Sequence, residues 1–228
     1  MQLLVATRNR DKLKELSAIL ADLPVEVISV ADRKGLPDIV EDAPTVRENA
    51  IKKAVETAKL AKMLTLADDT GLEVDALGGD PGVRSARYAG EKASYHENNK
   101  KLLAALHGVP MEKRTARFRC VVAVADENGL VDTVEGICNG LIIEEERGGG
   151  GFGYDPLFIP DGQVKTFAEL PLDIKNRISH RAKALQKAWA VLSRYVREHD
   201  SEGATGRKER IAKRRKASLS EESKSETA

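Results

Sequence analysis

Two adjacent carboxylates offer the most direct chemistry in this sequence. Asp68 and Asp69 follow residues 64–67, an apolar stretch that predicts a buried strand, and they precede Thr70 and Gly71. Such a pair is costly to bury unless it is solvated or binds a cation. Carboxylate oxygens suit Mg²⁺, and a carboxylate beside the metal can orient or deprotonate a water molecule. A helix cap or a tight turn is the alternative interpretation, and Gly71 indicates a turn in either case.

A run of polar and basic residues follows the first apolar stretch of the chain. Residues 2–6 predict a short strand and residues 12–21 a helix, so the run occupies a strand-to-helix turn. Amide groups at a helix N-terminus attract anions, which makes the turn a candidate phosphate site. Taken alone, the segment is better explained by an ordinary helix cap with solvated charges. The run comprises Thr7, Arg8, Asn9, Arg10, Asp11 and Lys12.

A glycine run at residues 148–151 leads directly into Phe152 and Tyr154. The pattern GxGxxG is formally present, but Asp155 and Pro156 follow it in place of a helix, which excludes a dinucleotide-binding turn. A glycine-rich loop that carries two aromatic rings can instead close over a planar base and stack on it. A β-bulge turn with core aromatic residues is the alternative.

The last predicted helix begins with a cluster of donors and cations. Lys175 precedes it, and Ser179, His180 and Arg181 open it, which favours an anionic ligand. A surface position at a helix start is the alternative. The sequence contains no GxxxxGK[ST], HExxH or paired CxxC motif, which excludes a P-loop and argues against a zinc site.

Helices and strands must hold these clusters together. Two capping boxes, Thr45-x-x-Glu48 and Ser94-x-x-Glu97, predict helices over residues 46–61 and up to about residue 106. An Asn-Gly pair at residues 128–129 predicts a hairpin between two long β-rich segments. The remaining predictions are strands at 25–28, 73–76, 116–125 and 131–143, loops at 32–44 and 77–82, and a final helix whose apolar stripe, Leu185, Trp189, Leu192 and Val196, is expected to face the core.

This order of elements predicts the α/β class. Helices and strands interleave first and a hairpin follows, which indicates a mixed sheet flanked by helices, with two lobes and a cleft between them. Proteins of this class place ligands at the ends of strands. The polar clusters lie at such ends, so we expect them to meet in one central cleft.

Composition narrows the class of protein further. The 228 residues carry 37 basic and 36 acidic side chains, which argues against a nucleic-acid coat over the whole chain. No apolar run approaches the ~20 residues of a membrane span, and the first residues lack the features of a signal peptide. Two cysteines, Cys120 and Cys138, are too few for a disulfide framework. We therefore expect a soluble, cytoplasmic protein of mixed α/β structure.

The charge is distributed unevenly along the chain. Residues 201–228 contain eight basic and five acidic side chains but only two large apolar ones, Ile211 and Leu219. Such a segment cannot bury enough surface to offset its ordering entropy. We therefore expect a folded domain over residues 1–200 and a disordered charged tail over residues 201–228.

Five segments together resemble the inosine triphosphate pyrophosphatase family, enzymes that act on non-standard purine nucleotides such as dITP and XTP. The resemblance covers residues 1 to about 197 in family order. Its most specific motifs are ADDTGLEVDALGGDPGVRSARY and GGFGYDP. The matching segments are LLVATRNRDKLKEL (3–16), EDAPTVRENAIKKA (41–54), ADDTGLEVDALGGDPGVRSARYAG (67–90), GGFGYDPLF (150–158) and ISHRAKAL (178–185).

The resemblance implies an elongated, two-lobed α/β homodimer. It also implies Mg²⁺-dependent hydrolysis of ITP, dITP or XTP to the monophosphate and pyrophosphate. Asp69 falls on the family's proton acceptor and metal ligand, and Glu41 on a second metal carboxylate. The implied substrate-binding positions are the turn Thr7 to Lys12 for the triphosphate, Thr70, and, chiefly around the base, Phe152, Gly153, Tyr154, Asp155, Lys175, His180 and Arg181.

The hydrogen-bonding chemistry of these side chains agrees with the implied roles. Inosine and xanthine carry an oxygen where adenine has an amine. Lys175, His180 or Arg181 would donate a hydrogen bond to that oxygen. The departures from the family pattern are small: Arg8 stands where small residues are common, and Thr70 replaces a serine but keeps its hydroxyl.

Two other functions are open from the sequence. Residues 207–216 form a basic run that could bind nucleic acid, although interspersed acidic residues favour a solubilising tail. A Maf-like pyrophosphatase for modified pyrimidine nucleotides is the other alternative, and the FGYDP and SHR segments weigh against it.

Overall fold

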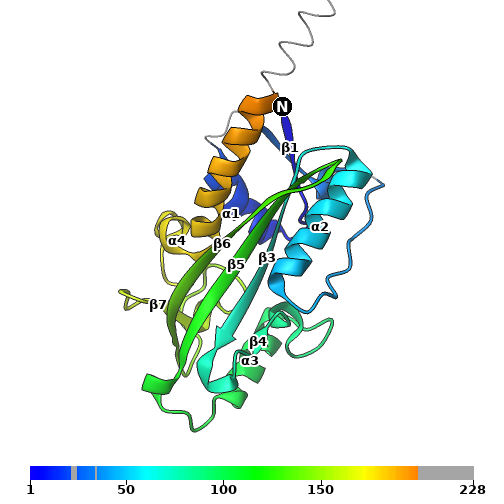
Figure 1. Cartoon of the computed structure of the whole chain (residues 1–228). Helices are drawn as coiled ribbons and strands as arrows, with labels where there is room; N and C mark the ends of the chain where they lie inside the picture. Colours follow the sequence, from blue (N-terminus) through cyan, green and yellow to red (C-terminus); the bar gives the residue numbers. More distant parts are fainter. Residues whose placement is uncertain (22–24, 34, 200–228) are drawn as a thin grey trace, which may run out of the picture. The chain divides into compact units, whose positions relative to one another are not determined.

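The computed structural model describes residues 1–21, 25–33 and 35–199, and the predicted charged tail lies outside these residues. The chain divides into two compact units, Met1–Trp189 and Ala190–Ala228. The first unit contains every described strand and the four labelled helices (Figure 1). Residues 180–189 in the first unit and 190–199 in the second are helical, as the sequence predicts.

The N-terminal part of the chain alternates strands and helices. Strand β1 (Gln2–Val5) leads into helix α1 (Arg10–Leu20) and strand β2 (Glu26–Ser29). Helix α2 (Val46–Ala61) begins at the predicted Thr45 cap, whose side chain accepts a hydrogen bond from the Glu48 amide. It ends at Lys62 in the left-handed conformation, with φ of 52°. The boundaries of α2 match the prediction to the residue.

The central strand is longer than the sequence predicts. Strand β3 (Thr65–Val74) joins the two predicted short strands into one, because strand β5 (Thr115–Asp126) pairs with it along its whole length. The predictions that the strand ends at Asp68 and Asp69, and that Gly71 makes a turn, are therefore wrong. Gly71 lies inside the strand, where an added Cβ would stand 2.7 Å from the carbonyl oxygen of Gly82. Glycine thus allows strand β4 (Pro81–Gly82) to approach β3.

The predicted hairpin is confirmed. Strand β6 (Gly129–Ile142) returns antiparallel to β5 after the Asn-Gly turn. Figure 1 shows β3, β5 and β6 as long neighbouring strands, with α2 beside them. The other elements are helix α3 (Tyr95–Ala105), strand β7 (Phe158–Pro160) and helix α4 (Leu172–Ile178).

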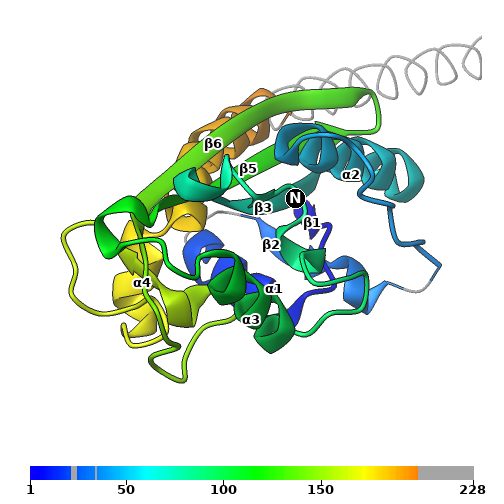
Figure 2. The same ribbon diagram turned by 90° about the horizontal axis from the view of Figure 1, so that it is seen from below.

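The sheet is mixed, as predicted. Among the described residues its strand order is β2-β1-β3-β5-β6-β7, with β4 on β3. The pairs β1–β2 and β1–β3 are parallel and the others antiparallel. Viewed from below, β1 and β2 continue the sheet formed by β3, β5 and β6 (Figure 2). Chain order reverses at β1, and the carboxyl end of such a strand is the usual ligand position in open α/β sheets.

Two hydrophobic clusters cover the two faces of the sheet. Alternate residues of β5 divide between them: Phe118 packs with Phe158 and Phe167, whereas Val121 packs with small residues of α2. The alanines of α2 (Ala50, Ala54 and Ala58) recur every four residues and are fully buried, so the helix lies close to the strands. One predicted core residue is placed differently, because Trp189 is 43% exposed.

Candidate active site

A gap in the sheet leaves the middle of β3 unpaired along one edge. Strand β1 pairs only with Thr65 and Leu66, and β4 only with Leu72 and Glu73. Because β5 occupies one edge of β3 throughout, residues 67–71 have a strand neighbour on that edge alone. The β1–α1 turn lies beside this gap, and a cavity of about 410 Å³ opens there.

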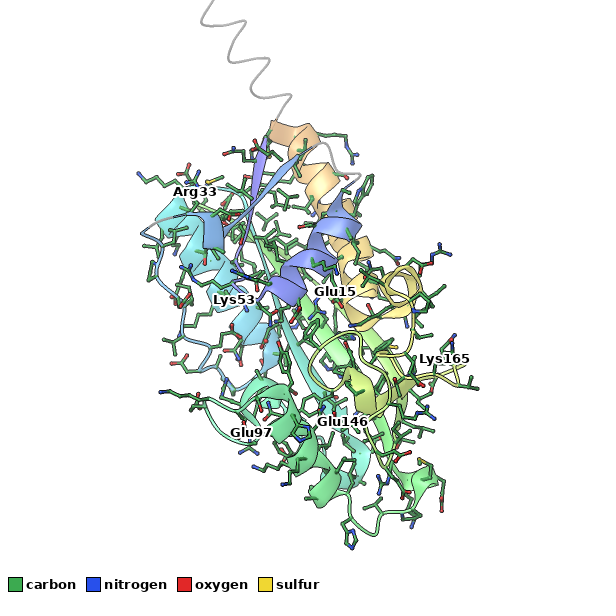
Figure 3. The ribbon with its side chains drawn as sticks, turned by 180° about the vertical axis from the view of Figure 1, so that it is seen from behind. Glu15, Arg33, Lys53, Glu97, Glu146 and Lys165 are labelled. Carbon is green, nitrogen blue, oxygen red and sulfur yellow. The ribbon has the colours of Figure 1, made fainter. Side chains whose placement is uncertain are left out.

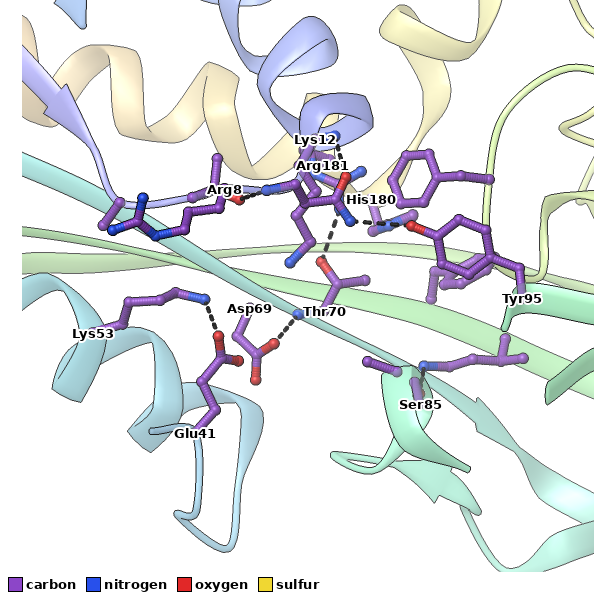
Figure 4. Close-up of a pocket in the computed structure, with 18 of the residues that line it drawn as sticks. Arg8, Lys12, Glu41, Lys53, Asp69, Thr70, Ser85, Tyr95, His180 and Arg181 are labelled. Atoms are coloured by element: carbon purple, nitrogen blue, oxygen red, sulfur yellow. Dashed lines mark hydrogen bonds and ion pairs between the residues drawn. The ribbon is translucent and has the colours of Figure 1, made fainter. Parts of the chain in front are cut away.

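The cavity gathers nearly all residues that the sequence singles out. Arg10 and Asp11 are exposed on α1 and do not line it. Figure 4 shows Asp69, Glu41, Lys53 and Arg181 converging on the same space from different elements. The predicted residues that line the cavity are Thr7, Arg8, Asn9, Lys12, Glu41, Asp69, Thr70, Phe152, Gly153, Tyr154, Asp155, Lys175, His180 and Arg181.

The β1–α1 turn is capped by its own side chains. The Asn9 side-chain oxygen accepts hydrogen bonds from the amides of Asp11 (2.9 Å) and Lys12 (3.1 Å), and the Thr7 hydroxyl accepts one from the Asn9 amide. These amides are satisfied, as the helix-cap interpretation predicts. The positive charge of the turn that lines the cavity comes from the side chains of Arg8, which pairs with Asp38, and Lys12, which pairs with Asp68.

Asp69 faces the cavity beside a second carboxylate, Glu41. Burial raises the pKa of Asp69 to about 6; Lys12 and Lys53 oppose the increase and Glu41 adds to it. One Asp69 oxygen accepts a hydrogen bond from the Thr70 amide (2.8 Å), and Glu41 accepts one from Lys53 (2.8 Å). At neutral pH Asp69 is an ionised carboxylate with unusually high basicity, which suits a proton acceptor.

Asp68 points to the other side of β3 and has a different role. Its carboxylate lies 3.3 Å from Lys12 Nζ and 3.2 Å from Arg181 Nε. Although burial acts to raise the pKa of Asp68, Lys12 and Arg181 hold it far below its usual range. Adjacent positions in one strand thus place one aspartate in a buried ion-pair network and the other in the cavity.

The buried network joins parts of the chain that are distant in sequence. Glu15 on α1 is 4% exposed, accepts a hydrogen bond from Arg181, and forms an ion pair with Lys175 Nζ at 2.7 Å. Lys175 also contacts Asp155, whose carboxylate accepts a hydrogen bond from the Phe152 amide (2.8 Å). In Figure 3, Glu15 lies on α1 and Lys53 on α2, whereas Lys165 lies at the periphery.

His180, one of the predicted base-binding residues, is buried and packed against an aromatic ring. His180 is 3% exposed and stacks on Phe118, with 4.5 Å between ring centroids. Burial, together with Arg181 and Lys175, lowers the pKa of His180 well below its usual value, so the ring is neutral. Its Nδ1 has no hydrogen-bond partner among the described residues. A buried, unpaired ring nitrogen beside a cavity is available to a polar ligand.

Both aromatic residues of the glycine loop line the cavity, but they are packed differently. Tyr154 is 4% exposed, belongs to the core, and donates a hydrogen bond to the Ser85 carbonyl (2.9 Å). Phe152 is half-buried, and Lys175 Nζ lies 4.9 Å from the centroid of its ring. Gly151, with φ of +69°, leaves room for the Asp155 carboxylate, which an added Cβ would meet at 2.2 Å.

The donor set fits Mg²⁺ bound together with a phosphate ligand. Among the described residues, no three His, Cys, Asp or Glu side chains form a metal cage. Two carboxylates, Asp69 and Glu41, are instead typical of a Mg²⁺ that also binds water and substrate phosphates. The cavity is lined by five cationic side chains and four carboxylates, so it nearly balances its own charge and a polyanion needs a further cation there.

Sequence reasoning missed several cavity residues. It also missed Glu15, which belongs to the buried ion-pair network and does not line the cavity; Glu15 follows Lys12 by three positions on one helix face, a spacing that could have identified it. Lys53, Ser85, Tyr95 and Phe118 carry no comparable signal, because distant strands and helices bring them to the cavity.

Comparisons with known proteins identify the family of this chain. The model of the Ham1 family matches residues 3–191. A dITP/XTP pyrophosphatase of Desulforamulus reducens is 52% identical over 194 residues, which cover 85% of this chain and 96% of that protein. One of Geobacter sulfurreducens is 51% identical, covering 81% and 92%. The solved structure of a HAM1 protein from Coxiella burnetii superposes with a TM-score of 0.77 at 40% identity, covering 85% of this chain and 99% of that one.

Proposed function

Because the chain belongs to the Ham1 family, we propose that it hydrolyses non-standard purine nucleoside triphosphates to the monophosphate and pyrophosphate. ITP, dITP and XTP are the proposed substrates, and removal of such nucleotides from the cellular pool is the proposed role. The observation that carries the proposal is the single cavity in which Asp69 meets the cations and aromatic residues of the family motifs. No helix among the described residues is long and apolar enough to cross a membrane.

The arrangement supports separate roles for the residues along the cavity. Arg8 and Lys12 bind the phosphates, Asp69 accepts a proton from the attacking water, and Glu41 and Asp69 hold Mg²⁺. When bound, the metal neutralises phosphate charge and lowers the pKa of nearby water. In the metal-free protein, burial raises the pKa of Asp69 to about 6, which makes this carboxylate a stronger base than an ordinary aspartate.

At the other end, His180, Lys175 and Arg181 select the base. Lys175 and Arg181 each have donor hydrogens beyond those used by Glu15, Asp155, Asp68 and Thr70. The neutral His180 ring supplies one further donor or acceptor. A purine with an oxygen at C6 satisfies these donors, whereas adenine leaves at least one of them unpaired, which costs binding energy.

A substrate panel tests the proposal. The protein is incubated with Mg²⁺ and dITP, XTP, dATP or dGTP, and pyrophosphate is measured separately from orthophosphate. Rapid pyrophosphate release from dITP or XTP, abolished by EDTA, is expected. Equal turnover of all four triphosphates would refute the base selectivity, and turnover in EDTA would refute the role of the metal.

Asp69→Asn tests the proposed proton acceptor. Turnover should fall by about two orders of magnitude or more, the usual range for loss of a general base, while the fold stays intact. Asp161→Asn, at an exposed position outside the cavity, is the control and should retain wild-type turnover.

We also propose that the active form is a cytoplasmic homodimer, which rests on the family resemblance. Light scattering on the full chain should give twice the mass of one chain; a monomer mass at working concentrations would contradict it. The Maf-like alternative is not favoured, because the matching family is Ham1. The basic run proposed for nucleic acid lies outside the described residues, and a gel shift with and without residues 201–228 tests it.

A further inference from the structure

Tyr95 stands at the mouth of the cavity and belongs to none of the predicted groups. It is the first residue of α3, directly after Ser94, whose capping box with Glu97 fixes the start of the helix. The side chain lines the cavity, yet the residue is 42% exposed. Figure 4 shows its ring reaching from α3 toward the groups around Arg181.

The hydroxyl of Tyr95 is linked to the β1–α1 turn. Asn9 Nδ2 donates a hydrogen bond to the Tyr95 oxygen at 3.1 Å. The orientation of the Asn9 amide is determined by its other bonds, since its oxygen accepts from two helix amides and its NH₂ group must point away from them. Because Asn9 is the donor, Tyr95 keeps its hydroxyl proton for another acceptor.

The ring of Tyr95 faces the glycine loop. Its centroid lies 6.0 Å from that of Phe152, with an interplanar angle of 42°. Phe152 also contacts Lys175 and Arg181, whose charged groups lie 4.9 and 5.4 Å from the centroid of its ring. The other aromatic side chains of the lining, Phe118 and Tyr154, are packed into the core. Tyr95 and Phe152 are thus the rings that remain open to a ligand.

We propose that Tyr95 is a substrate-binding residue that contacts the nucleoside part of the substrate. Its ring lies against a planar or apolar face of the nucleotide beside Phe152, and its hydroxyl donates to an oxygen between sugar and phosphate. The inference rests on the proposed function, because it requires a nucleotide in this cavity. It assigns Tyr95 to substrate affinity, since the hydrogen bond and ring contact of Tyr95 given by the described residues are with Asn9 and Phe152 and not with Asp69 or Glu41.

A strut that merely ties α3 to the β1–α1 turn is the competing explanation, and kinetics separates the two. Tyr95→Ala removes the ring and should raise the KM for dITP about tenfold, in the range of an aromatic–base contact, with kcat within about twofold of wild type. Tyr95→Phe keeps the ring and should raise KM only about threefold, the loss of one hydrogen bond. The matched control is His96→Ala, because His96 is the next residue, is exposed and lies outside the cavity.

Calorimetric titration with inosine monophosphate measures binding without turnover. Tyr95→Ala should weaken this binding by a similar factor, at an unchanged melting temperature. Wild-type turnover of dITP with unchanged KM and inosine monophosphate binding in Tyr95→Ala would overturn the role of Tyr95 and leave the proposed function intact. Equal losses in Tyr95→Phe and Tyr95→Ala, with a lowered melting temperature, would identify the strut. A wild-type protein that binds inosine monophosphate without hydrolysing dITP would refute the proposed function alone, and one that does neither would refute both.

Discussion

Asp69 illustrates how one side chain is kept in a state that costs stability. It is buried, lies near Glu41 and remains in the middle of a strand, where an apolar residue would pack without penalty. The neighbouring Asp68 has the opposite environment, with two cations at its carboxylate. The contrast is decided by the alternation of side chains along β3.

Because the pKa of Asp69 is raised, we predict that replacing Asp69 increases the stability of the protein by an amount that depends on pH. The folded-state pKa of about 6 exceeds the unfolded value of about 4, so ionisation disfavours folding above about pH 6 and has no effect below about pH 4. In EDTA, Asp69→Asn should therefore stabilise the protein by about 1–3 kcal/mol at pH 8, and the gain should vanish toward pH 4. Thermal unfolding across this range measures it, with Asp161→Asn as the control. A constant difference at all pH values would contradict the assignment.

At the scale of elements, β3 brings the active site together because two short strands leave its middle unpaired on one edge. This requires β4 to approach closely, and Gly71 permits it. Gly71→Ala should destabilise the protein by about 1–3 kcal/mol, because its Cβ would meet the Gly82 carbonyl at 2.7 Å and a Val46 methyl at 3.2 Å.

Urea unfolding measures this loss. Gly149→Ala is the matched control, because a Cβ at Gly149 meets nothing within 4 Å and needs no positive φ. Equal stability of the two variants would show that β4 moves away without cost.

Ion pairs join the carboxyl end of β3 to β5. Glu73 accepts hydrogen bonds from Arg117 (2.6 Å) and Arg119 (2.8 Å) on the paired strand. Although burial acts to raise the pKa of Glu73, the bonds from Arg119 and Arg117 lower it. The stabilisation is therefore present above the unfolded pKa of about 4.3 and is lost as pH falls through the lower folded value.

Glu73→Gln should accordingly lower the free energy of unfolding by about 0.5–1 kcal/mol at pH 7. The effect is small because solvent screens a partly exposed ion pair. The cost should shrink as the pH is lowered from 5 to 3. Urea unfolding at several pH values measures it, with the exposed Glu112→Gln for comparison. An effect that grows on acidification has the wrong sign for this interpretation.

At the scale of the whole Met1–Trp189 unit, one buried network joins α1, β3, α4 and the residues that open the last helical segment. Its charges are balanced, with Lys12, Lys175 and Arg181 against Glu15, Asp68 and Asp155. Removing one member leaves an uncompensated buried charge, which is far more costly than losing a surface pair.

Glu15→Gln should therefore destabilise the protein by about 3 kcal/mol or more, since it leaves Lys175 and Arg181 short of an anion. Chemical unfolding at pH 7 is the measurement. Glu56→Gln on the exposed side of α2 should change stability by less than about 0.5 kcal/mol. A loss below 1 kcal/mol for Glu15→Gln would show that the network relaxes or takes up water.

The sequence alone determined the local elements and the chemical inventory of this protein. Capping boxes placed the starts of α2 and α3, and the Asn-Gly pair placed the hairpin; the polar clusters together with the family resemblance named 14 residues that line the cavity. These signals act over a few residues, so they are readable without the fold.

Only the tertiary structure decided which partners these residues have. The pairing of β3 with β5 turned an expected turn at Gly71 into a strand, and it separated Asp68 from Asp69 onto two faces. Lys53 and Tyr95 reach the cavity, and Glu15 joins the buried ion-pair network, through contacts between elements that lie far apart in the chain. Burial and charge pairing, which set the pKa of Asp69 and the neutrality of His180, depend on those contacts and not on neighbours in sequence.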